Sequence, residues 1–180
     1  MSFSLPNRII LDDFLVHDQA NNEMLKASRL SASLSVLSLL SDKIDITSAQ
    51  LFGLQAHIIK ETGDSPYNFQ FIVDSLKSDD DKPEKPLNLS IRSIIIRNGS
   101  LKYDVLSEPD RNDFCPSHIA LKNLSGHFIL NKLTDSDLKL KVKRISFNES
   151  KGFALKDCAF SLEVDSTNAT INDLHLLRIT

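Results

Sequence analysis

The stretch IRSIIIRNGSLKY, residues 91–103, contains the two patterns from which we predict the fold. Apolar side chains alternate along it with polar ones, as in a strand that buries one face. The alternation changes phase at Arg92 and Ser93, because the apolar positions are odd-numbered in residues 87–91 and even-numbered in residues 94–96. A phase change within a strand indicates a β-bulge or a crossover of the side chains to the other face of the sheet.

An Asn98-Gly99 pair follows this run, and alternating apolar residues resume at Leu101 and Tyr103. Type I′ turns need positive φ at both central residues, so Asn-Gly between alternating apolar residues is a strong hairpin signal. We therefore expect two antiparallel strands here, with Ile96 facing Leu101 across the turn.

Two other stretches, residues 44–56 and 140–155, repeat this order of alternation, phase change and glycine-containing turn. Repetition of one strand-turn-strand unit is typical of repeat architectures, in which each unit buries its apolar face by stacking on its neighbours. The pairs expected in the third copy are Phe147 with Phe153, Ile145 with Leu155 and Val142 with Cys158.

The phase change itself recurs along the whole chain, always as an apolar residue, two polar residues and another apolar residue. Where such changes lie at the same level on neighbouring strands, they predict a line along which the sheet bends. The eight examples are Leu11–Phe14, Ala27–Leu30, Ile46–Ala49, Ile91–Ile94, Leu121–Leu124, Val142–Ile145, Leu155–Cys158 and Ile171–Leu174.

The predicted fold class is therefore mainly β: a long curved antiparallel sheet, a β-taco or repeating β-groove, with one or two short helices. Residues 65–76 favour an amphipathic helix with Ser65 as its N-cap, and residues 35–42 suggest a single helical turn. Residues 77–86 are predicted to form a polar loop. We expect residues 1–180 to form one β-groove segment, cut from a larger protein.

Composition gives no sign of an enzyme or of a nucleic-acid-binding protein. The net charge is −3 and 41% of the residues are hydrophobic, without a basic stripe or a glycine-rich phosphate-binding motif. No motif of a serine hydrolase, zinc protease or nucleotide-binding loop occurs. We expect neither an enzyme nor a cofactor.

The histidines and cysteines suggest no metal site either. Cys115 and Cys158 are expected to be unpaired, and His118 follows Cys115 without the second ligand pair that a tetrahedral zinc site needs. His17-Asp18 is expected to lie in a polar turn. Three histidines in the polar phase of strands are predicted to face solvent: His57, His127 and His175.

The candidate functional feature is the apolar face of the curved sheet. An open sheet whose apolar face is uncovered must hold a ligand, pair with another copy or continue into further repeats. The candidate lining residues are Ala49, Leu51, Leu54, Ile94, Ile96, Leu101, Tyr103, Ile145, Phe147, Phe153 and Leu155. The candidates for a second wall, beyond each phase change, are Ile44, Ile46, Leu89, Ile91, Leu140 and Val142.

The chain also resembles a known family in three stretches. They are FLVHDQANNEMLKASRLSASLSVLSLLSDKIDITSAQLFGLQAHIIKE (14–61), SPYNFQFIVDSL (65–76) and PLNLSIRSIIIRNGSLKYDV (86–105). The first two are similar to AsmA-like proteins, and the third is similar to the TamB (translocation and assembly module) branch of that group, in versions from Bacteroidetes-like bacteria. The resemblance is to a pattern of residue types in the N-terminal part of the periplasmic repeat region.

This resemblance implies a segment of a long periplasmic protein that is anchored in the inner membrane by an N-terminal helix, which this chain lacks. TamB-like proteins form a taco-shaped apolar groove and act in outer-membrane biogenesis. The implied partners are phospholipid acyl chains and an outer-membrane β-barrel assembly protein or its barrel client. Nucleic acid is not an expected partner.

Three functions are compatible with the sequence. The first is phospholipid transport between the inner and outer membranes along the groove. The second is a scaffold or chaperone for β-barrel assembly, in which a client strand adds to the sheet. The third is a secreted carbohydrate-binding or adhesive β-sandwich, although the chain has no Trp and only Tyr67 and Tyr103 as tyrosines for stacking on sugars.

Overall fold

The structure, a computed structural model, describes residues 2–3, 7–35, 43–76, 88–133 and 137–179. These residues are mainly β, with 69% of them in strands and one short helix among them, which confirms the predicted fold class. The polar loop expected at 77–86 lies outside the described residues, as does the helical turn expected at 35–42 apart from Ser35.

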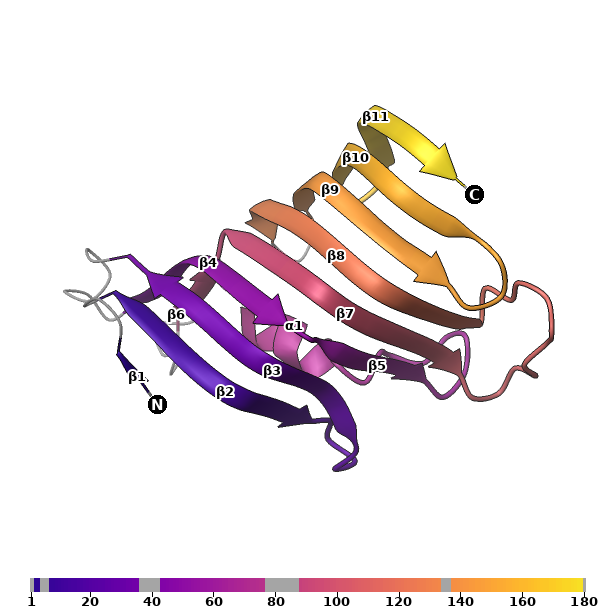
Figure 1. The fold of residues 1–180 in the computed structure, drawn as a ribbon, viewed down its shortest axis with the longest axis horizontal. Coiled ribbons are helices and arrows are strands. Elements are labelled where there is room, and N and C mark those ends of the chain that lie inside the picture. The colour runs from indigo at the N-terminus through magenta and orange to yellow at the C-terminus, as the bar shows by residue number, and fades with distance from the viewer. Residues whose placement is uncertain (1, 4–6, 36–42, 77–87, 134–136, 180) are drawn as a thin grey trace.

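The strands form one sheet in the order β1-β2-β3-β4-β7-β8-β9-β10-β11 (Figure 1). β5 lies between β3 and β7 beyond the end of β4, and β6 pairs with β4 ahead of β7. In chain order the elements are β1 (Ser2–Phe3), β2 (Arg8–His17), β3 (Glu23–Leu34), β4 (Lys43–Phe52), β5 (Gln55–Lys60), α1 (Gln70–Leu76), β6 (Asn88–Ile91), β7 (Ser93–Val105), β8 (His118–Leu133), β9 (Leu138–Glu149), β10 (Ala154–Val164) and β11 (Ala169–Ile179).

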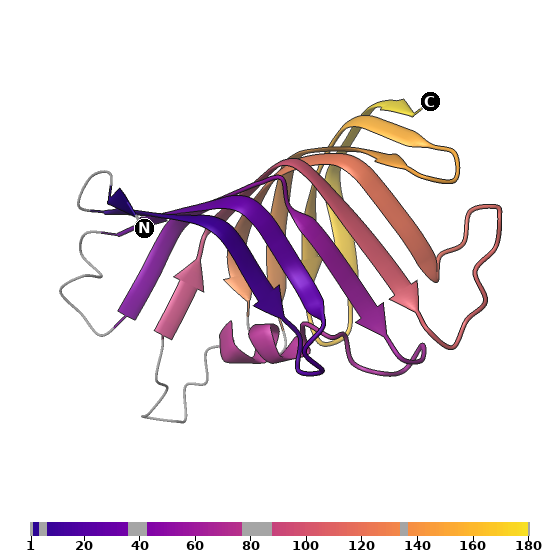
Figure 2. The same cartoon turned by 60° about the horizontal axis from the view of Figure 1, so that its bottom comes forward.

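Figure 2 shows the sheet as an arched single layer with α1 on its inner side. We call the face of the sheet toward α1 the inner face and the opposite one the outer face. Strand neighbours are antiparallel through most of the described sheet. The exception is the central seam, where β4 runs parallel to β6 and β7, and β5 runs parallel to β7.

The hairpin predicted at Asn98-Gly99 is wrong, because both residues lie inside β7, which continues to Val105. Asn98 has φ of 51°, whereas Gly99 is not among the described residues with positive φ. One left-handed residue makes a β-bulge, and a type I′ turn needs two. Ile96 therefore pairs with Gly126 of β8 and not with Leu101.

The first predicted unit, residues 44–56, is also not a hairpin. Gly53 has φ of 60°, and β4 and β5 on either side of it run in the same direction along β7. Gly53 N donates to Arg97 O (3.0 Å) and Ser100 N donates to Leu54 O (2.6 Å), so hydrogen bonding to β7 continues past the interruption. The glycine bends the strand without reversing it.

The third unit is a hairpin, as predicted, but with a different register. β9 and β10 are antiparallel and pair Phe147 with Leu155, Ile145 with Cys158 and Val142 with Phe160. At the turn, Glu149 N donates to Phe153 O (2.8 Å). The partner of Phe153 is therefore Glu149 and not Phe147.

Most of the predicted phase changes are bulges. Left-handed residues occupy three of them, Asp13 in β2 (φ 54°), Asn123 in β8 (φ 53°) and Asp173 in β11 (φ 53°). In β9 and β10 the phase changes coincide with shifts of register. Each extra residue returns the apolar side chains to the face they occupied before, so the sheet bends while its inner face stays apolar.

A second set of interruptions lies at the other end of the central strands. The register between β3 and β4 shifts between Ser33 and Leu34, next to the phase change at Ile46–Ala49. Arg92 separates β6 from β7, and its N–H donates to Ile46 O (3.1 Å) while its carbonyl accepts from Leu130 N (2.8 Å). The phase change of the opening stretch is therefore a real interruption of the strand.

The predicted helix is present as α1, but it begins at Gln70, so Ser65 is not its N-cap. The Ser65 hydroxyl instead accepts from Thr62 N (3.1 Å) in the turn before the helix. The segment before it lies against the free edge of β5, where the Asn68 side chain donates to His57 O (3.1 Å) and accepts from Ile59 N (3.1 Å). The Tyr67 ring stacks on Phe69 (5.0 Å between centroids) and contacts Tyr103 of β7 (6.4 Å). These contacts hold α1 under the arch.

The molecule has an open shape for its mass. Its accessible surface is 11773 Å², whereas a compact monomer of 20.2 kDa exposes roughly 8,700 Å². Met24 is the largest fully buried side chain among the described residues. Most apolar side chains of the inner face are only half-buried, so pairs across neighbouring strands provide much of the packing.

Candidate functional site

Apolar residues run in rows across the inner face, perpendicular to the strands. Directly paired residues on neighbouring strands share a face, so the pairing defines each row. One row is Leu11, Leu30, Leu51, Ile96, Gly126, Ile145 and Cys158, and the next is Ile9, Ala32, Ala49, Ile94, Phe128, Val142 and Phe160.

Two further rows lie on the other side of the bulges. The first is Val16, Leu25, Ala56, Leu101 and Leu121, and the second is Ile58, Tyr103 and Ile119. Because Tyr103 contacts Tyr67 of the segment leading to α1, these rows belong to the inner face. The bulges therefore divide the inner face into two sloping halves (Figure 2).

Seven of the candidate lining residues are in these rows: Ala49, Leu51, Ile94, Ile96, Leu101, Tyr103 and Ile145. The predicted division into two walls is wrong. Ile94, expected in one wall, shares a row with Val142, expected in the other. Leu101 and Tyr103 lie on the far side of the bulge at Asn98 from Ile94. The error follows from the hairpin predicted at Asn98, which would have made the two halves of β7 into neighbouring antiparallel strands.

The remaining candidates form smaller groups. Phe147 and Phe153 make an edge-to-face contact (5.8 Å), and Phe114 packs on Phe153 in the same manner (5.8 Å). Leu54 is buried beside the interruption between β4 and β5, and Leu155 pairs with Phe147. Candidates placed by their strand pairs are Ile44 with Leu89, Ile46 with Ile91, and Leu140 with Leu130 and Leu162.

Several residues of the rows were not among the candidates. Phe128, Phe160 and Leu30 are half-buried and extend the rows onto β8, β10 and β3. Their alternation with polar neighbours is visible in the sequence. Only the strand order, which places β8 beside β7, shows that they continue the same rows.

The rows end exposed at β11. Ile171, Leu174 and Leu176 are 60%, 64% and 48% exposed. β11 pairs with β10 on one side, and within the described residues no strand pairs with its other side. A free edge with exposed apolar residues is suited to the addition of another strand.

The outer face contains a polar cluster that the sequence did not reveal, which we call the Asp104 cluster. The Asp104 carboxylate, 11% exposed, accepts from His57 Nε2 (2.7 Å), His118 Nδ1 (2.9 Å) and Lys102 Nζ (2.8 Å). Burial by itself raises the pKa of Asp104, but these hydrogen bonds outweigh it and lower the pKa to about 2. The carboxylate is therefore ionised at neutral pH.

His118 in this cluster faces an acceptor at each ring nitrogen. Nδ1 meets Asp104, and Nε2 meets the Glu108 carbonyl oxygen at 2.8 Å. The hydrogen bond to Asp104 and then the one to Glu108 raise the pKa of His118. Only the imidazolium form can donate through both nitrogens, so the geometry favours a charged His118 that ties the β7–β8 connection to the sheet.

The other histidine and cysteine predictions have mixed outcomes. His57 is part of the Asp104 cluster, and His127 lies 3.1 Å from Ser93 Oγ with its pKa lowered by burial, so neither simply faces solvent. His175 is exposed, as predicted. Cys115 and Cys158 are both free and buried, which confirms that they are unpaired.

The expected turn at His17-Asp18 is confirmed. Asp18 Oδ1 accepts from Ala20 N (2.9 Å) and Asn22 N (2.8 Å). In the described parts of the chain, no group of three or more His, Cys, Asp or Glu residues is placed to hold a metal ion.

No protein-family model matches this chain, and no curated protein matches it in sequence. Its resemblance to the AsmA-like group stays a prediction. Over the ranges that the structure describes, no helix is both long enough and apolar enough to cross a membrane. The strand pairing defines the candidate functional site as the apolar rows of the inner face.

Proposed function

We propose that this chain is a non-enzymatic segment of an outer-membrane biogenesis factor, and that its inner face holds phospholipid acyl chains as they pass between the inner and outer membranes. The full-length protein would be anchored in the inner membrane and this segment would lie in the periplasm. The observation that best supports the proposal is the set of continuous, half-buried apolar rows on one face of an arched single sheet.

The physical reason is the cost of moving an acyl chain through water. Each methylene transferred from an apolar surface to water costs about 0.8 kcal/mol, so a whole chain does not cross water unaided at a useful rate. A row that continues from strand to strand keeps the acyl chain covered along its path. The phosphate-bearing head group would stay in solvent at the open side of the arch.

Mass spectrometry of lipids that co-purify with the protein tests this proposal. We expect phospholipid with the wild type, and a loss of most of it with Ile96→Asp, which places a charge in the centre of a row. Ile96→Ser is a milder second variant in case the charged one does not fold. Circular dichroism reports whether each variant keeps its β structure.

The matched control is Lys141→Asp. Lys141 is an exposed residue next to Val142 in β9 and its side chain points to the opposite face, so lipid should be retained. Loss of lipid in this control as well as in Ile96→Asp would indicate non-specific adsorption. Absence of phospholipid from folded wild-type protein would contradict the proposal.

A second function, a scaffold for assembly of outer-membrane β-barrel proteins, is supported by the edge of β11. Its apolar residues are exposed and its outer hydrogen-bonding groups have no strand partner in the described chain. A client strand could pair with this edge by augmentation. Photo-crosslinkers at Leu174 should then capture β-barrel precursors, whereas crosslinkers at Ile96 should capture lipid if the first proposal holds.

The third function considered, a carbohydrate-binding or adhesive sandwich, has the least support. A sandwich packs two sheets face to face, and the described strands form one sheet.

A further inference from the structure

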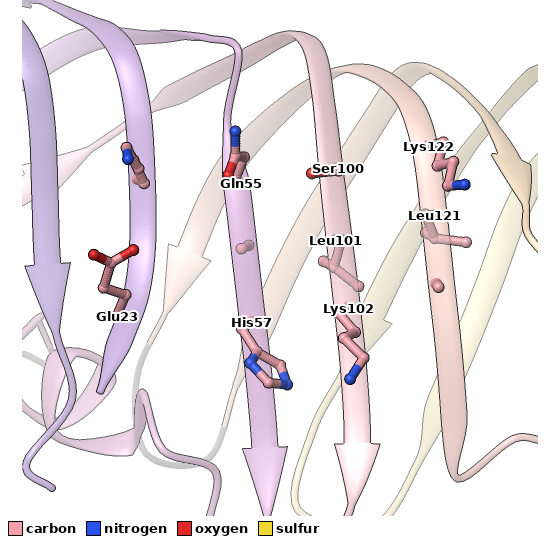
Figure 3. Close-up of a pocket in the computed structure, with 11 residues that line it drawn as sticks. Glu23, Gln55, His57, Ser100, Leu101, Lys102, Leu121 and Lys122 are labelled. Carbon is pink, nitrogen blue, oxygen red and sulfur yellow. The ribbon is translucent and has the colours of Figure 1, made fainter. Parts of the chain in front are cut away.

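A hollow of about 300 Å³ lies across β3, β5, β7 and β8 (Figure 3), and His57 and Lys102 of the Asp104 cluster are among its lining residues. This volume is at the lower end of the range for ligand pockets, so a compact ligand fits it best. Its lining residues are Glu23, Lys26, Gln55, Ala56, His57, Ser100, Leu101, Lys102, Ala120, Leu121 and Lys122. We call it the lysine hollow.

The hollow is on the outer face. Leu101 and Ala56 belong to a row of the inner face, so their neighbours Ser100, Lys102 and Gln55 point to the other side of the sheet. Leu25 and Tyr103, which point inward on the same strands, do not line the hollow. Ala56, Leu101 and Leu121 of that row also line the hollow, but most of its lining residues belong to the outer face.

Strand register explains why this part of the outer face is hollowed. Gln55 pairs with both Lys26 and Ser100, and the pairing of Leu101 with Leu121 brings Lys122 alongside Ser100. The small Ser100 occupies the middle of this transverse row, with the two long lysines at its ends. In the next row Ala120 is the small residue beside Lys102. Small side chains at the centre and long cationic ones at the rim leave a basin.

The charge of the basin is positive although the chain carries a net charge of −3. Three lysines line it against one carboxylate, that of Glu23. Lys102 is paired with Asp104, whereas Lys26 and Lys122 make no ion pair within the described residues and are exposed. Two cations are thus available to a ligand.

We propose that the lysine hollow binds a phosphate group. Lys26 and Lys122 would approach it from opposite sides, and the Ser100 hydroxyl and Gln55 amide would donate hydrogen bonds between them. Lysine ammonium groups act as point charges toward phosphate and do not demand one fixed geometry. This proposal is independent of the proposed lipid path on the inner face.

In the first test the protein is titrated with inorganic phosphate at constant ionic strength. Binding is monitored by the backbone amide signals of Ser100 and Leu121 in ¹H–¹⁵N spectra. We expect these signals to shift on titration. The double variant Lys26→Gln/Lys122→Gln should weaken binding about tenfold or more, since it removes two charge-assisted contacts. Binding should also weaken as sodium chloride is raised.

The matched control is Lys141→Gln, which removes one exposed lysine on β9 outside the hollow. It should bind phosphate as the wild type does. Unchanged binding in the double variant, or no phosphate-dependent shift in the wild type, would overturn the proposal.

Vesicles distinguish a free phosphate from a lipid head group. Co-flotation with phosphatidylglycerol-containing vesicles that the double variant loses and Ile96→Asp keeps would assign the hollow to a lipid phosphate. Phosphate binding without such flotation would assign it to a soluble phosphate compound. Flotation that is lost with Ile96→Asp and kept by the double variant, with no phosphate titration, would support the inner-face proposal and overturn this one.

Discussion

His118 and Asp104 face each other across β8 and β7, with 2.9 Å between Nδ1 and Oδ1. The pKa of the histidine is raised and that of the carboxylate is lowered to about 2. The two residues are directly paired in the ladder, so the ion pair fastens the ends of both strands where the β7–β8 connection begins.

The first prediction concerns the pH dependence of stability. A raised histidine pKa contributes stability that is complete below its ordinary value of 6.5 and is lost as the pH rises through the higher folded value. The lowered Asp104 pKa contributes stability above 3.8 that is lost as the pH falls toward 2. The free energy of unfolding from this pair should therefore be greatest between about pH 4 and 6.5.

Denaturant unfolding at pH 5.5 and pH 8.5 measures this effect. His118→Gln should reduce the difference between the two pH values, whereas His175→Gln, at an exposed position of β11, should leave it unchanged. Asp104→Asn should lower stability by about 2 kcal/mol at pH 5.5, because it removes the charge that three donors share. An equal pH response in wild type and His118→Gln would contradict the assignment.

The second prediction concerns the bulge at Asn98. Its φ of 51° is tolerated by Asn and Gly but is strained for a β-branched residue. Asn98→Val should lower the free energy of unfolding by about 1–2 kcal/mol, and Asn98→Gly should be nearly neutral. The control is Asn172→Val in β11. Asn172 does not have a positive φ, so this substitution should lower the free energy of unfolding by less. Equal losses at both positions would argue against the left-handed bulge.

The third prediction tests the close approach of β7 to the β4–β5 interruption. A Cβ at Gly99 would lie 3.1 Å from Leu54 O and 3.1 Å from Ile96 Cγ2. Gly99→Ala should destabilise the protein by about 1–3 kcal/mol in thermal or chemical unfolding. Gly63→Ala is the control, because its Cβ would meet nothing within 4 Å. A stabilising Gly99→Ala would mean that the two strands are farther apart.

The fourth prediction concerns the attachment of α1. Asn68→Ala removes two hydrogen bonds to the free edge of β5 and should speed hydrogen exchange in α1 and at Ile59. Gln70→Ala, which removes a contact only to Asp74 within the helix, should have little effect at Ile59. Unaltered exchange in Asn68→Ala would contradict this prediction and show that the aromatic contact of Tyr67 with Tyr103 is enough to hold α1 against the sheet.

The sequence was enough to predict the fold class, the helix α1 and most of the bulges. Alternation indicates strands, and a two-residue interruption such as Asp12-Asp13 indicates where a strand takes an extra residue. Both are local properties. The helix was also predicted from local sequence, through its apolar spacing, although it begins at Gln70 and not at the expected cap Ser65.

The hairpin at Asn98 could not be judged from local sequence. Asn-Gly is suited both to a turn with two left-handed residues and to a bulge with one. Hydrogen bonds from neighbouring strands decide between them, here those that join Gly53 to Arg97 and Ser100 to Leu54. Those neighbours are set by the parallel seam, which no feature near Asn98 reveals.

The Asp104 cluster was missed for a related reason. His57 and His118 are far apart in the sequence; His57 appears only as a polar residue in an alternating strand, and His118 only as a possible metal ligand near Cys115. The parallel pairing of β5 with β7 and the antiparallel pairing of β7 with β8 bring both beside Asp104. The sequence predicted that the inner face is apolar. Which residues share a row could be assigned only once the strand order was known.

The parallel seam also has a consequence for how the chain folds. It joins β1–β5 to β6 and to β7–β11, and the last group is a meander of strands that neighbour one another in sequence. Closing a long crossover costs more chain entropy than closing a short turn, so pairing across the seam should form last, after the antiparallel pairing on either side of it. Pulse-labelled hydrogen exchange would then show late protection of the amides of Gly53 and Ser100, which donate across the seam, and early protection there would reverse this order.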